Sequence, residues 1–330
     1  MSDTGNAVEI ERYGRPAPVT RLIGWTILGA LAAFLIGNIL QVGFGFGSAT
    51  ATFRGDLSGA LPLLIYVITI GAGIVYVLRS PDTALRWDAE KIHQANVYIL
   101  RGVYFSVLFV GLLDVSISFM RVEKVFDLFL SVDMVHNFER PEFVGLFIYF
   151  PVMILSFVLA VFTRTLGFHW LALMIILAEL SIVITRFVFS YEQAFMGDLV
   201  RYWYSALFLL AAAYTLHEEG HVRVDILYSG FSARKKGIFN VFGILLLGVP
   251  TTAAILAVGF SGKQSIINSP VMNFEVTQTG GIGMYVKYQM AAFLGIFAAT
   301  MMVQFVSMLF DSMADFRGEP GHRETEAVAQ

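Results

Sequence analysis

The sequence predicts an all-α membrane protein with about eight transmembrane helices. Hydrophobic residues make up 57% of the 330-residue chain, charged residues only 14%, and the mean hydropathy is +0.70. Eight apolar runs are each long enough to cross a hydrocarbon core of about 30 Å, because a helix rises about 1.5 Å per residue. The alternating pattern of a membrane β-barrel is absent, so we expect the backbone to satisfy its hydrogen bonds as helices.

The expected spans lie near residues 22–46, 58–78, 97–119, 143–163, 167–189, 201–217, 237–260 and 288–312. The segment before the first span, 1–21, is polar and has no features of a cleavable signal peptide. An even number of spans puts both termini on one side of the membrane. With the termini inside, cytoplasmic segments carry thirteen Lys and Arg residues and outer segments carry six, which predicts cytoplasmic termini.

Two connections between spans are long and contain residue patterns that are typical of helices. After the second span, Ser80 can cap a helix that has Pro81 at its first position, which predicts a short helix at the inner membrane surface. After the third span, residues 121–138 place Val and Phe at helical spacing, which predicts an amphipathic helix in the outer interface. Packing of this segment on neighbouring spans as ordinary core is the alternative interpretation.

The glycine-rich stretch 43–48 ends a span and is interpreted as a helix terminator, not as a phosphate-binding loop.

Charged residues inside the spans are costly in hydrocarbon and require partners. Glu179 and Arg186 lie seven residues apart on nearly the same face of the fifth span, about 10 Å along the axis, so they cannot pair directly. Asp114 and Arg101 in the third span are farther apart, and Arg101 is expected to reach the inner headgroups. We interpret these groups as locks between helices; a proton or ion pathway is the alternative.

The stretch HEEGH, residues 217–221, fits the zinc-peptidase pattern H-E-x-x-H. A third ligand is missing, because His322 in the polar tail is the only later histidine. Gly220 and the alternating residues after it predict that the helix ends before His221. The chain has no cysteine. We therefore predict no metal site, no cofactor and no enzyme activity, with an intramembrane zinc metallopeptidase using His217, Glu218 and His221 as the alternative.

A series of motifs follows in the second half of the chain. An Arg-aromatic-x-Phe motif ends one span, an acidic residue and Arg three positions later enter the next, a His-x-Arg-x-Asp box follows, and Ser-x-Arg begins another. These positions are Arg186 to Phe189; Asp198 and Arg201; His221, Arg223 and Asp225; and Ser232 with Arg234. Before the last span stand Glu275, Gly280, Gly281 and Lys287. This order resembles the small membrane subunit, DctQ-type, of TRAP (tripartite ATP-independent periplasmic) transporters.

The resemblance covers residues 165–312 and predicts four regions. These are a cytoplasmic segment 1–21, an additional four-span region 22–164, a four-span TRAP small-subunit-like domain 165–312, and a polar tail 313–330. Asp198 stands where the family usually has glutamate, and it still reaches Arg201 across one helical turn. Phe195 stands in place of the usual preceding tryptophan. The first four spans have no counterpart in the common short form, so the chain resembles an enlarged variant.

The resemblance implies an accessory subunit in the bacterial inner membrane. In the family, a periplasmic solute-binding protein captures an organic acid, and a large membrane subunit moves it by a sodium-driven elevator motion. The small subunit braces the immobile scaffold of the large one, so the substrate is chosen by other chains. A self-sufficient carrier or channel is the other alternative. Nucleic acid is not an expected partner.

The resemblance also implies site residues. We expect one set to hold a cytoplasmic arm and the helix ends against each other or against the large subunit: Arg186, Asp198, Arg201, His221, Arg223, Asp225 and Lys287. Arg234, Lys235 and Lys236 are expected to meet phospholipid headgroups, at about 1 kcal/mol each.

Overall fold

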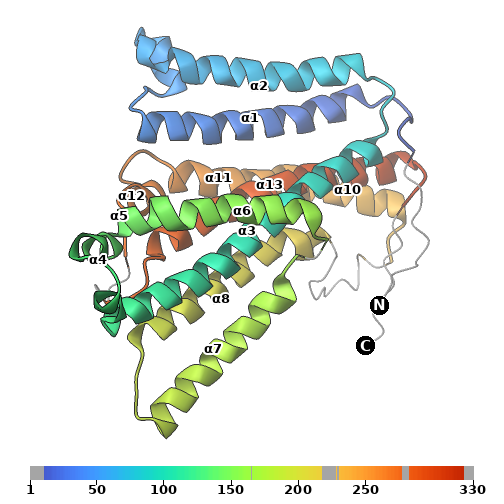
Figure 1. Ribbon diagram of the computed structural model, residues 1–330. Coiled ribbons are helices and arrows are strands. Elements are labelled where there is room, and N and C mark those ends of the chain that lie inside the picture. The colour runs from blue at the N-terminus through green and yellow to red at the C-terminus, as the bar shows by residue number, and fades with distance from the viewer. Residues whose placement is uncertain (1–10, 165, 218–227, 229, 277–281, 323–330) are drawn as a thin grey trace. The chain divides into compact units, whose positions relative to one another are not determined.

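The described part of the chain is helical. The computed structural model describes residues 11–164, 166–217, 228, 230–276 and 282–322 (Figure 1). Within these ranges the only extended pairing is an isolated bridge between Tyr13 and Thr83. Eight of the described helices are long and apolar enough to cross a membrane. The predicted all-α membrane fold is therefore confirmed, while the side on which the termini lie stays a prediction.

The eight spans follow the predicted order with shifted ends. They are α1 (Pro18–Gly43), α2 with its preceding turn (Leu57–Arg79), α3 (Leu85–Val122), α5 to α6 (Pro141–Phe162), α7 (Phe168–Val188), α8 (Ala194–His217), α10 to α11 (Ala233–Gly259) and α13 (Lys287–Arg317). Short helices η3 (Val125–Leu128), α4 (Val132–Phe138) and α12 (Asn268–Met272) lie in the connections. The first span ends at Gly43 and Gly45 has a φ of 77°, which confirms helix termination in the glycine-rich stretch.

Two spans contain a π-helical turn just before a proline. The turns are η4 (Gly145–Tyr149) and η5 (Ile244–Gly248), and the prolines are Pro151 and Pro250. Proline has no N–H, so the carbonyl one turn earlier loses its donor and the helix widens locally. Each span continues through its proline and keeps its membrane length.

The expected short helix after the second span is not separate, so this prediction was wrong. Helix α3 begins at Leu85 and runs without interruption for 38 residues. Leu85, Ala89 and Ile92 are buried at helical spacing and continue the buried side of the span that follows. Ser80 caps no helix, because its hydroxyl instead accepts a hydrogen bond from Arg21 and donates one to the carbonyl of Tyr76.

The expected amphipathic helix over residues 121–138 is broken into pieces, so a single helix was also wrong. Lys124 has a φ of 55°, in the left-handed region, and separates α3 from η3. Phe126 is buried and its ring stacks on that of Phe138 with centroids 4.6 Å apart, so the segment folds back on itself. Leu128 and Val132 are 83% and 86% exposed. The segment thus has a small core of its own and an apolar exposed side.

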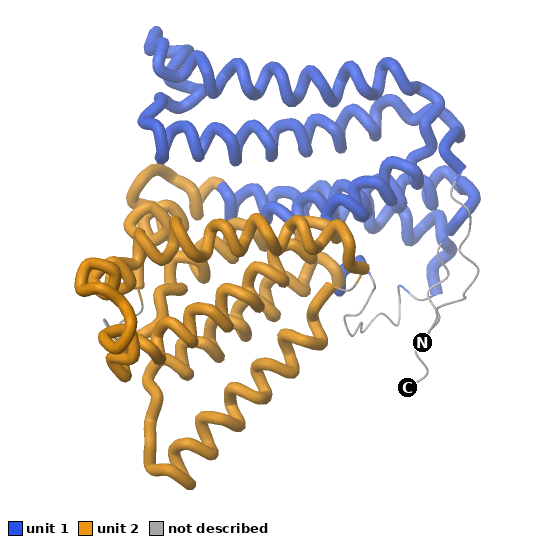
Figure 2. The backbone as a smooth tube through the Cα atoms, in the orientation of Figure 1, with its two compact units in different colours: residues 1–96, 215–256, 298–330 blue, residues 97–214, 257–297 orange. Residues whose placement is uncertain are grey.

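The chain forms two compact units (Figure 2). Unit 1 comprises residues 1–96, 215–256 and 298–330, and unit 2 comprises residues 97–214 and 257–297. Helices α3, α8, α11 and α13 contribute residues to both. These units are defined by contacts between residues. The predicted boundary between residues 164 and 165 is based on the family resemblance instead and stays a prediction.

The core of unit 1 is built on α3 and α13. Its buried apolar residues are Ala17, Leu85, Ala89, Ile92, Ile244, Val306, Leu309, Phe310 and Ala314. Helices α1 and α2 pack closely at Gly29, where an added Cβ would lie 2.9 Å from the carbonyl oxygen of Thr69. The Thr69 hydroxyl donates to the carbonyl of Gly29 at 2.8 Å. This close approach allows a hydrogen bond between helices, as in other membrane helix pairs with small residues.

The core of unit 2 centres on Trp203 of α8. Its indole N–H donates to the carbonyl of Val107 on α3 at 3.1 Å. A Cβ added to Gly111 would lie 2.2 Å from the same nitrogen, so glycine makes room for the indole. Tyr104 of α3 donates from its hydroxyl to the carbonyl of Leu207. Side chains of one helix thus bond to backbone of the other along the α3–α8 pair.

Candidate functional site

Unit 1 contains a fully buried arginine near the start of α1. The Nε of Arg21 donates to Asp88 Oδ2 at 2.8 Å, and both side chains are at most 1% exposed. Its other guanidinium nitrogens donate to the carbonyl and hydroxyl of Ser80. Asp88 also accepts from Trp25 at 3.1 Å and from Tyr76 at 2.9 Å. This charge-neutral cluster, which we call the ion-pair clamp, joins α1, the end of α2 and the start of α3.

A second buried arginine of unit 1, Arg86 on α3, binds residues of α13 and of the segment after it. Arg86 lies 2.6 Å from Asp315 and 3.7 Å from Asp311, and it donates to the carbonyl of Pro320 at 2.7 Å. Arg317 lies 3.0 Å from Glu319. Burial raises the pKa of the Glu319 carboxyl, and the positive charge of Arg317 opposes this shift. These contacts secure residues 311–320 to α3.

His217, from the zinc-like pattern, lies in a buried polar cluster of unit 1. Its ring stacks on that of His93 with centroids 3.4 Å apart and planes 15° apart. Gln304 bonds the Nδ1 of both rings, through Oε1 to His93 at 3.0 Å and through Nε2 to His217 at 3.2 Å. Parallel stacked rings direct their lone pairs side by side, so these two imidazoles do not converge on one metal ion. Glu218 and His221 lie outside the described residues, and no group of three metal-binding side chains occurs within them.

In unit 2, the segment before α13 is held by side chains of α3 and α8. Asp114 accepts a hydrogen bond from the backbone N–H of Tyr285 at 2.8 Å, and Asp198 accepts one from that of Met284 at 3.2 Å. Arg121 donates to the carbonyl of Gly283, and its guanidinium lies 3.9 Å from the centre of the Tyr285 ring. Both carboxylates are buried. We call this arrangement the backbone clamp, because it fixes three consecutive residues by their main chain.

Three of the sequence-predicted site residues lie around this clamp. Asp198 is 3.6 Å from Arg201, which confirms that the shorter carboxylate reaches across one turn. Lys287 is 2.7 Å from Glu275, and the N–H of Tyr288 donates to the carbonyl of Glu275. The acidic and basic residues that precede the last span are therefore an ion pair at the start of α13.

None of the other predicted residues that the structure describes lies in this arrangement. Arg186 is exposed on α7 and has no hydrogen bond or ion pair among the described residues. The box residues His221, Arg223 and Asp225, together with Gly280 and Gly281, lie outside the described residues. The basic residues that begin α10 each lie over an aromatic ring: Arg234 over Phe316, Lys235 over Phe231 and Lys236 over Tyr228.

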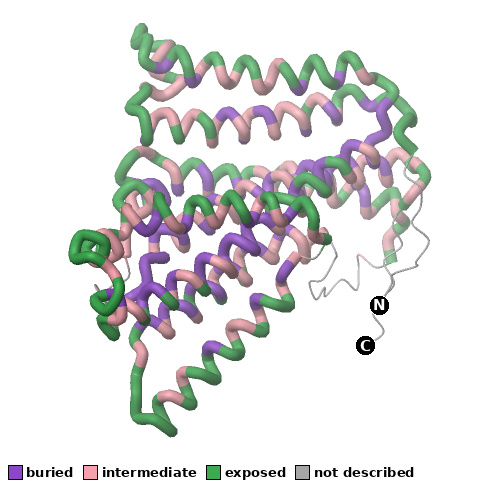
Figure 3. Tube along the Cα trace, in the orientation of Figure 1, coloured by how far each residue is buried: buried purple, intermediate pink, exposed green. Residues whose placement is uncertain are grey.

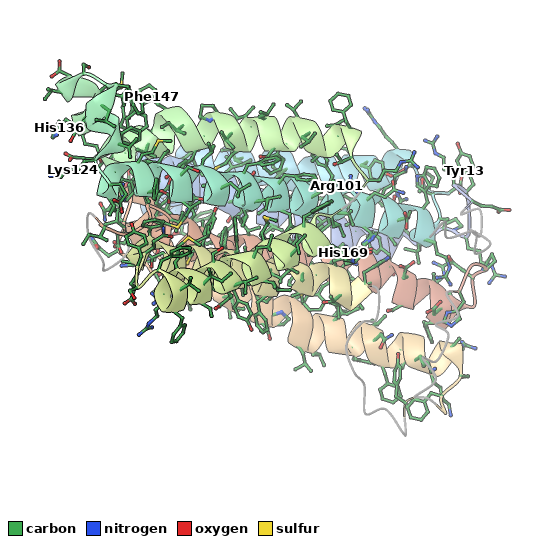
Figure 4. The ribbon with its side chains drawn as sticks, turned by 60° about the horizontal axis from the view of Figure 1, so that its bottom comes forward. Tyr13, Arg101, Lys124, His136, Phe147 and His169 are labelled. Carbon is green, nitrogen blue, oxygen red and sulfur yellow. The ribbon has the colours of Figure 1, made fainter. Side chains whose placement is uncertain are left out.

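Arg101 binds backbone carbonyls at the end of α6. Its guanidinium, on α3 (Figure 4), donates to the carbonyls of Ala160 and Arg164, both at 3.2 Å. A cation beside the last carbonyls of a helix is favourable, because these carbonyls have no partner within the helix. Arg101 therefore binds the end of α6 within unit 2, and its expected contact with the inner headgroups stays a prediction.

The sequence patterns did not identify the ion-pair clamp. Neither Arg21 nor Asp88, 67 residues later, is a predicted site residue. In the backbone clamp, Asp198 is a predicted site residue, and Asp114 is expected to need a partner because a charge within a span is costly. That partner is a backbone N–H, which every residue except proline offers, so the sequence does not identify it.

Comparison with known proteins identifies the second half of the chain. Residues 172–315, a little under half of the sequence, match the family model for the DctQ component of tripartite ATP-independent periplasmic transporters. No curated protein and no solved structure matches the chain. The match begins in α7 and ends in α13, so the spans from α1 to α6 precede it. Residues 172–315 therefore belong to the DctQ component family of tripartite ATP-independent periplasmic (TRAP) transporters, and additional membrane-length helices precede this region.

Proposed function

We propose that this subunit braces the scaffold of a large elevator subunit during sodium-coupled, binding-protein-dependent uptake of an organic acid across the bacterial inner membrane. The DctQ match over residues 172–315 is the observation that carries this proposal. The partners are the large TRAP membrane subunit, a periplasmic solute-binding protein and phospholipid. In this proposal the chain is not an enzyme and has no cofactor.

The use of buried charge supports a bracing role. Asp88 is neutralised by Arg21, while Asp114 and Asp198 are occupied by backbone N–H groups of the segment before α13. Carboxylates that carry an ion through a membrane need open coordination, whereas these hold helix ends and a loop in one geometry. A rigid part is what a scaffold support requires.

The predicted site residues divide into four proposed roles. Asp198, Arg201 and Lys287 position the start of α13, and Arg186 contacts the large subunit. His221, Arg223 and Asp225 secure a cytoplasmic arm. Arg234, Lys235 and Lys236 meet anionic headgroups, and their position over aromatic rings agrees with a membrane interface, where such rings are common.

The outer connection 121–138 is a proposed docking element for the solute-binding protein or a shield for the scaffold. The segment exposes Leu128, Phe129 and Val132 at 83%, 62% and 86%. Apolar side chains of this size on a short, folded connection are typical of an interaction surface. Deletion of residues 125–138 is expected to lower uptake while the two membrane subunits still co-purify.

The bracing role is tested by co-purification with the large subunit. Arg223→Glu should reduce the amount of large subunit recovered with the tagged chain and should lower uptake, because it reverses a charge in the arm. Arg54→Glu, an exposed reversal in the first connection, is the matched control and should change neither. Unchanged assembly and uptake with Arg223→Glu would reject the role of the arm.

A further inference from the structure

Helix α7 is the least covered span in its unit. Of its 21 residues, Phe168–Val188, only Leu171 and Ala178 are buried (Figure 3). Most of the exposed side chains are apolar, which lipid accepts without a protein partner. Two carry a full charge: Glu179 and Arg186 are both exposed, and neither has a hydrogen bond or ion pair within the described residues.

The depth of Glu179 makes it the more demanding of the two. It lies eleven residues after Phe168 and nine before Val188, which is about 16 Å and about 14 Å along the helix. A carboxylate at this position is near the middle of a hydrocarbon core about 30 Å thick. Arg186 is near the end of the helix and can reach an interface, but Glu179 cannot. Ionisable residues at this depth face protein or water, not lipid.

The two charges share a face that this chain leaves open. Seven residues separate them, so they project from nearly the same side of α7, about 10 Å apart along the axis. Ile176 and Val183 lie on that side and are 62% and 50% exposed. Leu171 and Ala178, by which α7 packs within unit 2, lie about a quarter-turn away at about 100° per residue. The charged face is therefore available to another molecule.

A second copy of this chain does not fit the charged face. Copies inserted in the same orientation pair by a two-fold axis along the membrane normal, which makes their α7 helices parallel. Parallel pairing sets Glu179 near Glu179 and Arg186 near Arg186, so like charges meet in a medium of low dielectric. Only an antiparallel pair of α7 helices would bring Glu179 of one copy near Arg186 of the other. Two copies inserted in the same orientation cannot form such a pair. The partner that offers opposite charges to Glu179 and Arg186 is therefore a different chain.

We propose that the Glu179 face of α7, formed by Ile176, Glu179, Val183 and Arg186, docks a transmembrane helix of the large TRAP subunit. That helix carries a basic or hydrogen-bond-donating side chain at the depth of Glu179 and an acidic one about 10 Å along, opposite Arg186. The assignment rests on the proposed function, since it presupposes the large subunit as partner. It adds which face makes the contact and with what chemistry.

The absence of cysteine from the sequence permits a direct test on the complex in native membranes. Single variants Ile176→Cys and Val183→Cys probe the charged face. Leu177→Cys and Ile184→Cys probe the other side of the same helix and are 44% and 42% exposed. Each variant is labelled with benzophenone maleimide and irradiated. We expect the first two to cross-link the large subunit several-fold more than the last two.

Charge variants complete the experiment. Glu179→Lys should lower co-purification of the large subunit several-fold more than Glu179→Gln, because it brings a positive charge against a basic partner. Cross-links to a second copy or to lipid from the charged face, or equal cross-linking from all four positions, would overturn this assignment. A wild-type chain that does not co-purify with the large subunit would instead overturn the proposed function itself.

Discussion

The two units hold their helices together by different chemistry. In the ion-pair clamp of unit 1, one buried side-chain charge meets another, Arg21 and Asp88. In the backbone clamp of unit 2, the buried carboxylates of Asp114 and Asp198 accept from the main chain of the segment before α13. Loss of one partner leaves an unpaired charge in the first case and an unpaired neutral N–H in the second. Removal of one partner is therefore expected to destabilise the protein more in the ion-pair clamp than in the backbone clamp.

The clamps also differ in which parts of the chain they join. The ion-pair clamp is built entirely from residues before the matched region 172–315, and it ties α1 and α2 to α3. The backbone clamp combines Asp114, from before that region, with Asp198 and Met284 from within it. Helix α3 thus contributes one carboxylate to each clamp, Asp88 to the first and Asp114 to the second.

The largest expected effect is in the ion-pair clamp. Arg21→Met leaves Asp88 buried without its cation, which should lower the free energy of unfolding by about 3 to 5 kcal/mol. The double variant Arg21→Met with Asp88→Leu should recover part of this loss, because no charge remains buried. Thermal unfolding in detergent measures both, with the exposed Lys91→Met as control. A single variant as stable as the wild type would contradict the comparison.

A smaller and more local effect is expected in the backbone clamp. Asp114→Ala leaves the N–H of Tyr285 without its acceptor, at a cost of about 1 to 3 kcal/mol. Hydrogen exchange should accelerate mainly in peptides that contain residues 282–286. Asp133→Ala, an exposed acid in α4, should leave these peptides unchanged. Faster exchange throughout the chain would mean that this clamp carries global stability as well.

Glycine variants in α1 test how much the close packing of α1 on α2 contributes to stability without any change of charge. Gly29→Ala places a methyl group 2.9 Å from the backbone oxygen of Thr69, which should destabilise the protein by about 1 to 3 kcal/mol. Gly37→Ala, where nothing lies within 4 Å, should be neutral or stabilising by about 0.5 to 1 kcal/mol. Melting temperatures of the two variants that do not differ would show that the helix pair tolerates separation.

The smallest expected effect is at the ion pair between Lys287 and Glu275. Both side chains are partly exposed, at 43% and 34%, so water and salt screen their attraction. Lys287→Gln should change the free energy of unfolding by at most about 1 kcal/mol, and less at high salt. A loss as large as that of Arg21→Met, measured by the same melting experiment, would place this pair among the buried ones.

Local pattern predicted much of this structure. Hydropathy gave eight spans in the right order, and helical spacing gave the meeting of Asp198 with Arg201 across one turn. Capping preference at Ser80 was misleading, because Arg21 from another helix takes the hydroxyl that the cap would use. The pair Arg21 and Asp88, 67 residues apart, depends on how helices pack, which no single-sequence pattern records. Glu179 was noticed as a charge without a partner, but only its exposure in the folded chain indicates that the partner lies outside it.

Reconstitution into proteoliposomes tests the central claim, that this chain supports transport and does not perform it. Vesicles with a sodium gradient would contain the chain alone, the large subunit alone, or both, each with the solute-binding protein and a labelled organic acid outside. We predict uptake only when both membrane subunits are present. Uptake by vesicles that contain this chain without the large subunit would contradict the account.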